Sequence, residues 1–237
     1  MSRVENEKKF HNTRFSDGKV GPSKYYKALE IWNRKYSDFI AICSHKKILE
    51  IGSGLESICN DFGADETFNI SSIDISDEAI SLMNDLIYKN CKFFVMDAHK
   101  TTFNDSSFDL ICGKGVLHHL DLKVAIEEIR RLLKPDGVVI FAEPLNTNFI
   151  INIYRALTPN IRTIDERPLS NDDINFIKIN ISHIEVKYYG FLTLILSILN
   201  KKSPKLIHAI DDFILNSTPV GRYLAWSCLI YSKKKQK

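Results

Sequence analysis

The chain has 237 residues, 44% hydrophobic and 26% charged, which is typical of a globular protein large enough to bury a substantial core. Its formal net charge of +3 is too small to argue for a nucleic-acid partner, and none is expected. The N-terminal residues lack an apolar signal core, and the longest apolar stretch, 188–199, is shorter than the roughly 20 residues that span a bilayer. We therefore expect a cytoplasmic protein.

The five cysteines are scattered and form no C-x-x-C pair, so the sequence predicts neither a zinc site nor a disulfide framework. Cys59, Cys91 and Cys112 lie among apolar residues and are predicted to be small core fillers. A reducing compartment fits this pattern best. No metal is expected.

Residues 1–45 are predicted to form an N-terminal helical lid. Residues 21–42, GPSKYYKALEIWNRKYSDFIAI, indicate one helix after a Gly-Pro break, with Ser23 as its N-cap. Apolar and aromatic residues recur there at helical spacing. We expect Tyr25 and Tyr26 to pack in the core, although an aromatic lid is the alternative.

From residue 46 the pattern alternates between strand and helix. The strand-like runs are 46–52, 66–74, 91–97, 108–113 and 137–144, and the helical runs between them are 55–62, 76–89 and 122–134. The loop KPDG at 134–137 is predicted to end the last helix. This alternation predicts βαβ units and a parallel sheet with both faces covered.

After Pro144 the pattern changes. Residues 158–173 are predicted to be a loop, 183–191 a strand, 191–200 and 204–216 helices, and 223–232 a final strand at the sheet edge. The chain is thus predicted to be an α/β protein with a doubly wound, mostly parallel, seven-stranded Rossmann-like sheet. Helices cover both faces, residues 46–237 form the main domain, and 145–220 form a C-terminal helical cap.

The stretch ILEIGSGLES, residues 48–57, passes from a strand through a glycine turn into a helix, which is the usual cradle for a nucleotide-like ligand. Glu56 disfavours a pyrophosphate, which prefers a bare helix N-terminus. Three strand-end acids, Glu50, Asp74 and Asp97, suit instead a ligand with a ribose, an adenine edge and a cationic amine.

Residues 48–144 resemble the class I S-adenosylmethionine-dependent methyltransferases, in particular the ubiquinone and menaquinone biosynthesis branch. The matching motifs are LEIGSG, IDIS, MDAHKTTFNDSSFDLI, GVLHHL and RRLLKPDGVVIFAEP. Leu55-Glu56 departs from the pattern, since many members have a small residue and a glycine there. The resemblance implies S-adenosylmethionine as cofactor and methyl transfer as activity.

The resemblance also implies roles for individual residues. Gly52, Ser53 and Gly54 would wrap the methionine and ribose portion, and Glu50 would help hold the amino group. Asp74 would bind the ribose hydroxyls and Ile75 would lie against the adenine. Asp97 and Ala98 would meet the adenine edge, and the Gly113 backbone would face the methionine portion.

Three further residues are predicted at the acceptor side. His118 or His119 could deprotonate an acceptor hydroxyl, although packing of the next helix is the alternative. Glu143 ends the fifth predicted strand and could orient the acceptor or bond to a neighbouring backbone. Because the methyl donor is already activated, a base is needed only if the acceptor must lose a proton.

We expect a small, apolar or aromatic, lipid-like acceptor, with O-methylation favoured over C- or N-methylation. Residues 145–216 are expected to build the acceptor pocket with the N-terminal helix, using Phe149, Tyr154, Phe176, Phe191, Leu192 and Leu196. Weak membrane-surface contact through 188–205 is the alternative use of that stretch. A nicotinamide-dependent oxidoreductase and a non-catalytic binding module are the rival functions, and the oligomeric state stays open.

Overall fold

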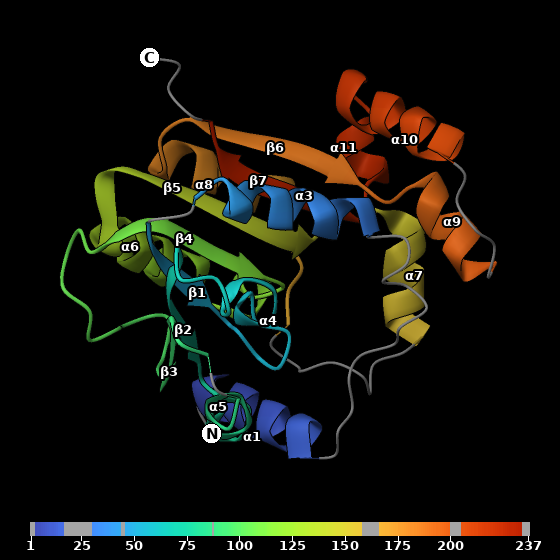
Figure 1. Cartoon of the computed structure of the whole chain (residues 1–237). Helices are drawn as coiled ribbons and strands as arrows, with labels where there is room; N and C mark the ends of the chain where they lie inside the picture. The colour runs from blue at the N-terminus through green and yellow to red at the C-terminus, as the bar shows by residue number, and fades with distance from the viewer. Residues whose placement is uncertain are drawn as a thin grey trace.

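A computed structural model describes residues 3–16, 30–43, 46–86, 88–157, 166–199 and 205–233. Its centre is a seven-stranded sheet in the order β3-β2-β1-β4-β5-β7-β6 (Figure 1). The strands are β1 (Lys47–Ile51), β2 (Asn69–Asp74), β3 (Cys91–Val95), β4 (Phe108–Lys114), β5 (Leu133–Pro144), β6 (Ile184–Tyr189) and β7 (Ser227–Ser232). Strands β1 to β5 pair in parallel and β7 runs antiparallel to both its neighbours, which confirms the predicted fold class.

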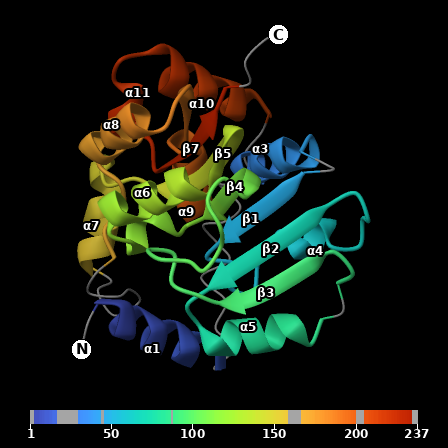
Figure 2. The ribbon, with the colours of Figure 1, turned by 90° about the vertical axis from the view of Figure 1, so that its left-hand side faces the viewer.

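Alternate side chains of the central strands enter two separate cores, one on each face of the sheet. Ile48 and Leu110 pack with α3 (Glu30–Ala41) and α4 (Cys59–Phe62), whereas Leu49 and Ile111 pack with α6 (Leu122–Leu132) and α8 (Asn171–Asn180). Strands buried on both faces need this near-continuous apolar sequence, because successive side chains point in opposite directions. Figure 2 shows the helices on either side of the twisted sheet.

The C-terminal part of the sheet differs from the prediction. The final strand β7 lies between β5 and β6, so β6 is the edge strand and the predicted edge position of 223–232 is wrong. Two helices that the sequence analysis did not predict, α7 (Phe149–Leu157) and α8, occupy much of 145–180. The amphipathic patterns of these helices are short and are interrupted by polar residues, which hid them in the sequence.

Strand β5 begins immediately after α6, without the predicted loop at 134–137. Leu133 pairs with Phe108 and Val138 pairs with Leu110, so five residues of β5 span two of β4. Asp109 lies opposite this irregularity, where it accepts hydrogen bonds from Lys134 Nζ at 2.9 Å and from the Lys47 amide at 3.0 Å. Pro135 and Gly137 favour such a bulge because proline lacks an amide donor and glycine allows close packing.

The two N-terminal helices have different positions. Trp32 and Tyr36 of α3 are buried against the sheet, and the Trp32 indole donates to the Cys228 carbonyl at 3.0 Å. Helix α1 (Arg3–Ser16) lies instead across the carboxyl ends of the first strands, beside α5 (Asp77–Asn84) (Figure 2). Of the two described helices within the predicted lid 1–45, α1 has a lid position and α3 does not. Ser23, Tyr25 and Tyr26 lie outside the described residues.

Cys59 and Cys91 form a disulfide, so the prediction that no cysteines pair is wrong for these two. Their sequence separation of 32 gives no local motif. They meet because β3 pairs with β2, which places Cys91 opposite Ile70, where it packs with Cys59 of α4 in the same core. The sequence analysis inferred a reducing compartment because it expected no paired cysteines, and this disulfide removes that reason. Cys43, Cys112 and Cys228 are buried thiols that take no part in this disulfide.

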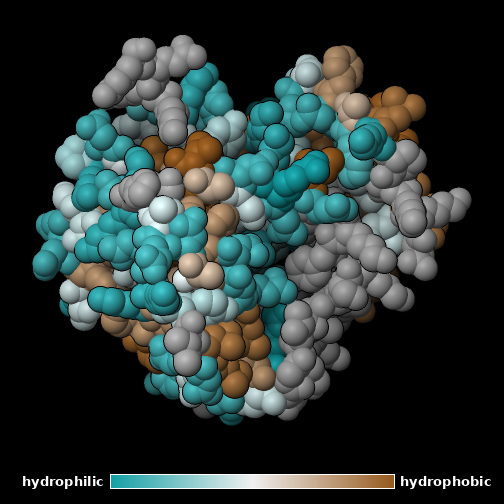
Figure 3. All heavy atoms as spheres, viewed as in Figure 1, coloured by the Kyte–Doolittle hydropathy of each residue, from teal (hydrophilic) through white to brown (hydrophobic). Residues whose placement is uncertain are grey.

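Residues beyond β6 form a cap of α9 (Leu192–Ile198), α10 (Lys205–Ser217) and α11 (Gly221–Leu224). Buried Asp211 of α10 accepts hydrogen bonds from the Leu192 and Thr193 amides at 2.7 and 3.0 Å, which fastens α10 to the start of α9. Helix α10 exposes Leu206 and Phe213, and Figure 3 shows hydrophobic side chains gathered at its position.

Within the described part of the chain, no helix is long and apolar enough to cross a membrane. Contact of 188–205 with a membrane surface stays a prediction, and residues 200–204 lie outside the described ranges.

Candidate cofactor and acceptor site

The site lies where the strand order reverses, between β1 and β4, which is where open α/β sheets bind ligands at the carboxyl ends of their strands. One pocket opens there between these strand ends and α1. Six of the predicted cofactor residues line it: Gly52, Gly54, Asp74, Ile75, Asp97 and Ala98. The sequence therefore located the main wall of the pocket.

The glycine turn after β1 requires backbone that only glycine adopts easily. Gly52 and Gly54 have φ values of +69° and +47°. A Cβ atom on Gly52 would lie 2.6 Å from Cγ2 of Val116, a side chain of the loop after β4. The turn is held by the Gly52 amide, which donates to the Ile73 carbonyl at 2.8 Å. Glycine thus lets the loops after β1 and β4 approach each other at the pocket floor.

Asp74 ends β2 and fixes the glycine turn while it faces the pocket. Its Oδ2 accepts from the Gly54 amide at 2.8 Å and its Oδ1 from the Ser76 amide at 2.9 Å. Each carboxylate oxygen keeps a second acceptor site, as required for two ribose hydroxyls. Ser76 caps α5 through a hydrogen bond from the Ala79 amide, so capping does not account for Asp74.

Glu50 and Gly113 lie beside the pocket rather than on its lining. Buried Glu50 accepts hydrogen bonds from the Ile58 amide at 2.9 Å and Ser72 Oγ at 2.7 Å. Burial raises the pKa of Glu50, and these hydrogen bonds partly offset that effect. A Cβ on Gly113 would meet the Ile51 carbonyl at 2.9 Å. Contacts of Glu50, Ser53 and Gly113 with the cofactor stay predictions.

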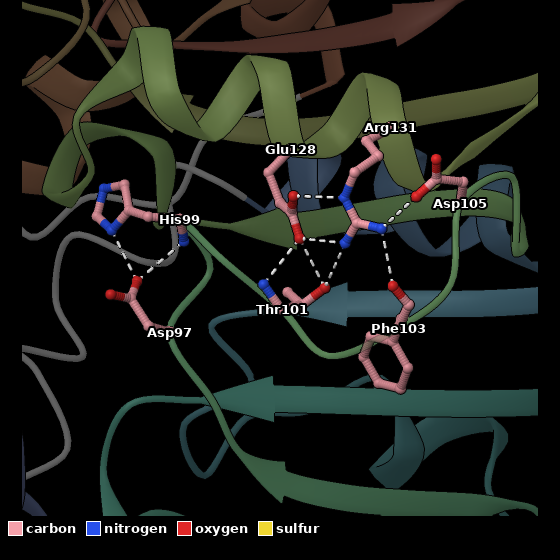
Figure 4. A network of polar contacts seen from close by, with 7 residues as sticks. All are labelled: Asp97, His99, Thr101, Phe103, Asp105, Glu128 and Arg131. Carbon is pink, nitrogen blue, oxygen red and sulfur yellow. Dashed lines mark hydrogen bonds and ion pairs between the residues drawn. The ribbon is translucent and has the colours of Figure 1, made fainter.

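The loop after β3 carries Asp97 and is attached to α6 at two points, of which Figure 4 shows the second, together with Asp97 and His99. Asp97 Oδ1 accepts from the His99 amide at 2.9 Å and lies 2.7 Å from His99 Nδ1. His99 Nε2 in turn accepts from the Asp121 amide at the start of α6, at 2.8 Å. His99 also lines the pocket, although the sequence analysis did not select it.

The second fastening point is a network around Glu128 and Arg131 of α6, which Figure 4 shows with the loop residues they contact. Glu128 Oε1 accepts from the Thr101 amide and hydroxyl, both at 2.7 Å, and from Arg131 Nη2 at 2.7 Å. Arg131 Nη1 also donates to the Phe103 carbonyl at 2.8 Å. Burial alone would raise the pKa of Glu128, but the Arg131 and Thr101 hydrogen bonds outweigh it and lower the pKa to about 2.

The three predicted catalytic residues divide into a buried pair and one pocket residue. Glu143 is fully buried at the end of β5 and accepts from the Val116 and Leu117 amides, at 3.0 and 2.9 Å, while His118 Nδ1 lies 2.8 Å away. Glu143 therefore holds the short helix η2 (Leu117–His119) in place through these two amides and the His118 side chain. Only His119 lines the pocket. Burial lowers the pKa of His119, so its imidazole is neutral near pH 7.

Helix α1 supplies the opposite wall of the pocket. The sequence analysis predicted an N-terminal lid but selected none of the α1 residues that line the pocket. Its lining residues are Arg3, Val4, Glu7, His11 and Phe15. Val4, Glu7, His11 and Phe15 recur at spacings of three and four, a pattern that marks one face of a helix and could have revealed this wall. The described residues of 145–220, which are 145–157, 166–199 and 205–220, do not line this pocket, and Phe149 is 69% exposed. Their part in acceptor binding stays a prediction.

Comparisons with known proteins agree with this geometry. Residues 49–141 match the methyltransferase domain family. The chain is 29% identical over 99 residues to the 2-methyl-6-phytyl-1,4-hydroquinone methyltransferase of Synechocystis sp., covering 40% of this chain and 31% of that protein. It is 27% identical over 119 residues to the demethylmenaquinone methyltransferase of Staphylococcus aureus, covering 48% and 49%. The matches thus span about a third to a half of these curated relatives.

A similar fold is found in the crystal structure of a SAM-dependent methyltransferase from Archaeoglobus fulgidus. Its TM-score is 0.61 at 16% sequence identity, and the match covers 89% of this chain and 96% of that one. The chain therefore carries a class I S-adenosylmethionine-dependent methyltransferase domain, whose cofactor is S-adenosylmethionine. More particularly, the matched segment is similar to methyltransferases that are named for quinone substrates.

The residues present fit this cofactor. The wall at Gly52 and Gly54 lacks side chains, so backbone can approach a ligand closely, and Asp74 keeps acceptor capacity for hydroxyl groups. Three strand-end acids next to the turn favour a ligand with a cationic centre over a pyrophosphate. The comparisons likewise favour the methyltransferase interpretation over the nicotinamide-dependent one.

Proposed function

We propose that this protein transfers the methyl group of S-adenosylmethionine to a small apolar acceptor of the quinol class. The observation that carries the proposal is the pocket, which is lined by Asp74 and Asp97, our candidates for the cofactor side, and by apolar side chains such as Val4, Val116 and Leu120. The names of the curated relatives, a hydroquinone and a demethylmenaquinone methyltransferase, support the acceptor class.

The protein's task in such a reaction is alignment and exclusion of water. When bound, S-adenosylmethionine supplies a methyl group that is already activated by its sulfonium. The chain must hold the acceptor atom in line with that methyl group and keep solvent out. Helix α1 suits this task because it covers the strand ends and places Phe15 beside the glycine turn.

His119 is the polar residue that we assign to the acceptor hydroxyl, because it faces the pocket and Glu143 and His118 hold its segment in place. The favoured reacting atom is a hydroxyl oxygen of the acceptor, and a ring carbon is the alternative. A neutral imidazole can accept a hydrogen bond from the hydroxyl in either case.

The test is an assay with S-adenosylmethionine labelled in its methyl group, using a prenylated naphthoquinol, a prenylated benzoquinol and a polar catechol without a prenyl chain. We expect labelled product from a prenylated quinol and at least a tenfold lower rate with the polar catechol. Mass spectrometry and NMR of the product would then distinguish oxygen from carbon methylation. Faster turnover of the polar catechol than of both prenylated quinols would contradict the proposed acceptor class.

A further inference from the structure

Three side chains that could bind a metal ion converge on the pocket wall opposite the glycine turn. Glu7 and His11 belong to α1, and His119 belongs to η2, more than 100 residues later in the chain. Glu7 Oε2 lies 3.4 Å from His11 Nε2 and 3.2 Å from His119 Nδ1. All three ligand atoms lie within 4.8 Å of one another.

The cluster results from the position of a helix that other contacts also hold. Glu7 and His11 are four residues apart and therefore share one face of α1. On its α5 side, Ser76 Oγ donates to Asn12 Oδ1 at 2.6 Å, and Lys8 pairs with Asp77 at 2.6 Å. Since the helix is attached at these points, the approach of its Glu7 and His11 to His119 does not depend on one polar contact.

The spacing of the three atoms is compatible with ligands of a single metal ion. Two ligands bonded to a tetrahedral ion at 2.0–2.1 Å are about 3.3–3.4 Å apart, close to both Glu7 distances. The contact between His119 Nδ1 and Glu7 Oε2 has the length of an ion pair, and a metal ion between the two atoms would keep that separation. The side chains of Glu7, His11 and His119 are only 7%, 19% and 17% exposed, so an ion bound there would be largely shielded from solvent.

We propose that Glu7, His11 and His119 bind a divalent transition-metal ion, with zinc as the best-suited metal. Two imidazoles and one carboxylate form a ligand set that holds zinc and leaves a coordination position open. A second carboxylate, that of Glu166, lies within 4.8 Å of a ring nitrogen of His119 and could orient the imidazole from outside. Sequence reasoning could not find this site because only α1 packing brings the ligands together.

The site would have two consequences. The ion would fasten α1 over the cofactor pocket, since it links α1 to the segment after β4. Its open position would face the pocket and hold an acceptor oxygen in place of the direct hydrogen bond to His119, and this second consequence rests on the proposed function. Metal binding itself does not depend on methyl transfer, so the two ideas can fail separately.

The experiment is calorimetric titration of the chelator-treated full chain with Zn²⁺, repeated with Co²⁺ while visible absorption reports the coordination geometry. We expect one equivalent with tetrahedral Co²⁺ absorption in the wild type. His11→Asn, His119→Asn and the nearly isosteric Glu7→Gln should each weaken binding at least tenfold. His208→Asn, on α10 far from the cluster, is the control and should bind as the wild type does.

Circular dichroism would establish that each variant is folded before its titration is interpreted. Absence of stoichiometric binding in the wild type would overturn the proposal, as would unchanged affinity in the folded Glu7→Gln variant. Zinc binding without methylation of any quinol would instead overturn the proposed function and leave the metal site standing.

Discussion

Asp74 combines two tasks at the residue scale, because the same carboxylate shapes the glycine turn and faces the pocket. Its two oxygens receive the amides of Gly54 and Ser76, and thereby hold the ends of two loops at fixed positions. A carboxylate held in this way needs no reorganisation to accept hydroxyl groups of a ligand. Preorganisation of this kind lowers the cost of binding.

Replacing Asp74 by alanine should therefore weaken binding of S-adenosylmethionine by roughly 1–3 kcal/mol, since hydrogen bonds to a charged group are lost. Calorimetric titration with the cofactor measures this directly. Asp85→Ala is the matched control, because Asp85 follows α5 and does not line the pocket. If Asp74→Ala and Asp85→Ala bind the cofactor equally well, the assignment of the ribose site is wrong.

At the element scale, α6 positions the loop that carries Asp97. Residues 101–105 belong to no strand or helix. Glu128 and Arg131 hold them through hydrogen bonds to the backbone and side chains of this loop. Since the loop has no regular structure of its own, its path depends on this network. The part of the pocket wall formed by Asp97 and Ala98 is thus supported from the opposite end of the loop.

Glu128→Gln should lower the free energy of unfolding by about 1–3 kcal/mol at pH 7, because a partly buried charged partner of Arg131 is lost. The pKa of Glu128 is lowered in the folded state to about 2, so its stabilising effect is complete above the ordinary value of 4.5. The effect decreases as the pH falls from 4.5 towards 2.

Urea unfolding of the wild type and Glu128→Gln at a series of pH values measures this effect. The two free energies should converge below pH 4.5. Exposed Glu127→Gln is the control and should follow the wild type throughout. A difference that stays constant down to pH 2 would show that Glu128 does not stabilise the fold through its charge.

At the scale of the whole molecule, α1 is the one described helix that lines the pocket from outside the matched domain segment, 49–141. It contacts α5 and the pocket rather than either sheet core. A helix attached mainly by polar contacts over a ligand pocket has little apolar burial of its own. Its stability should consequently depend on what fills the pocket.

Hydrogen exchange should therefore slow in residues 3–16 by at least tenfold when S-adenosylhomocysteine binds, because the ligand supplies a surface for α1 to pack against. Mass spectrometry of peptides from the free and bound protein gives the comparison. Residues 205–217 of α10 serve as the internal control and should exchange at the same rate in both states. Equal exchange of residues 3–16 in the two states would exclude α1 as a lid.

The sequence by itself determined the class of fold, the cofactor and the main wall of the pocket. These depend on local patterns, namely apolar strands, the glycine turn and acids such as Asp74 at strand ends, each of which is complete within about ten residues. Such patterns can be read from the sequence because their physical causes are local. A buried parallel strand must be apolar on both faces, and a tight turn needs glycine.

Only the tertiary structure decided which residues meet from distant parts of the chain. The Cys59–Cys91 disulfide, the internal position of β7 and the approach of Glu7 and His11 to His119 all depend on long-range packing. No local pattern encodes such contacts, because their geometry follows from strand order and helix placement. For the same reason the sequence could not distinguish the two adjacent histidines. In the structure His119 lines the pocket, whereas the His118 side chain contacts Glu143.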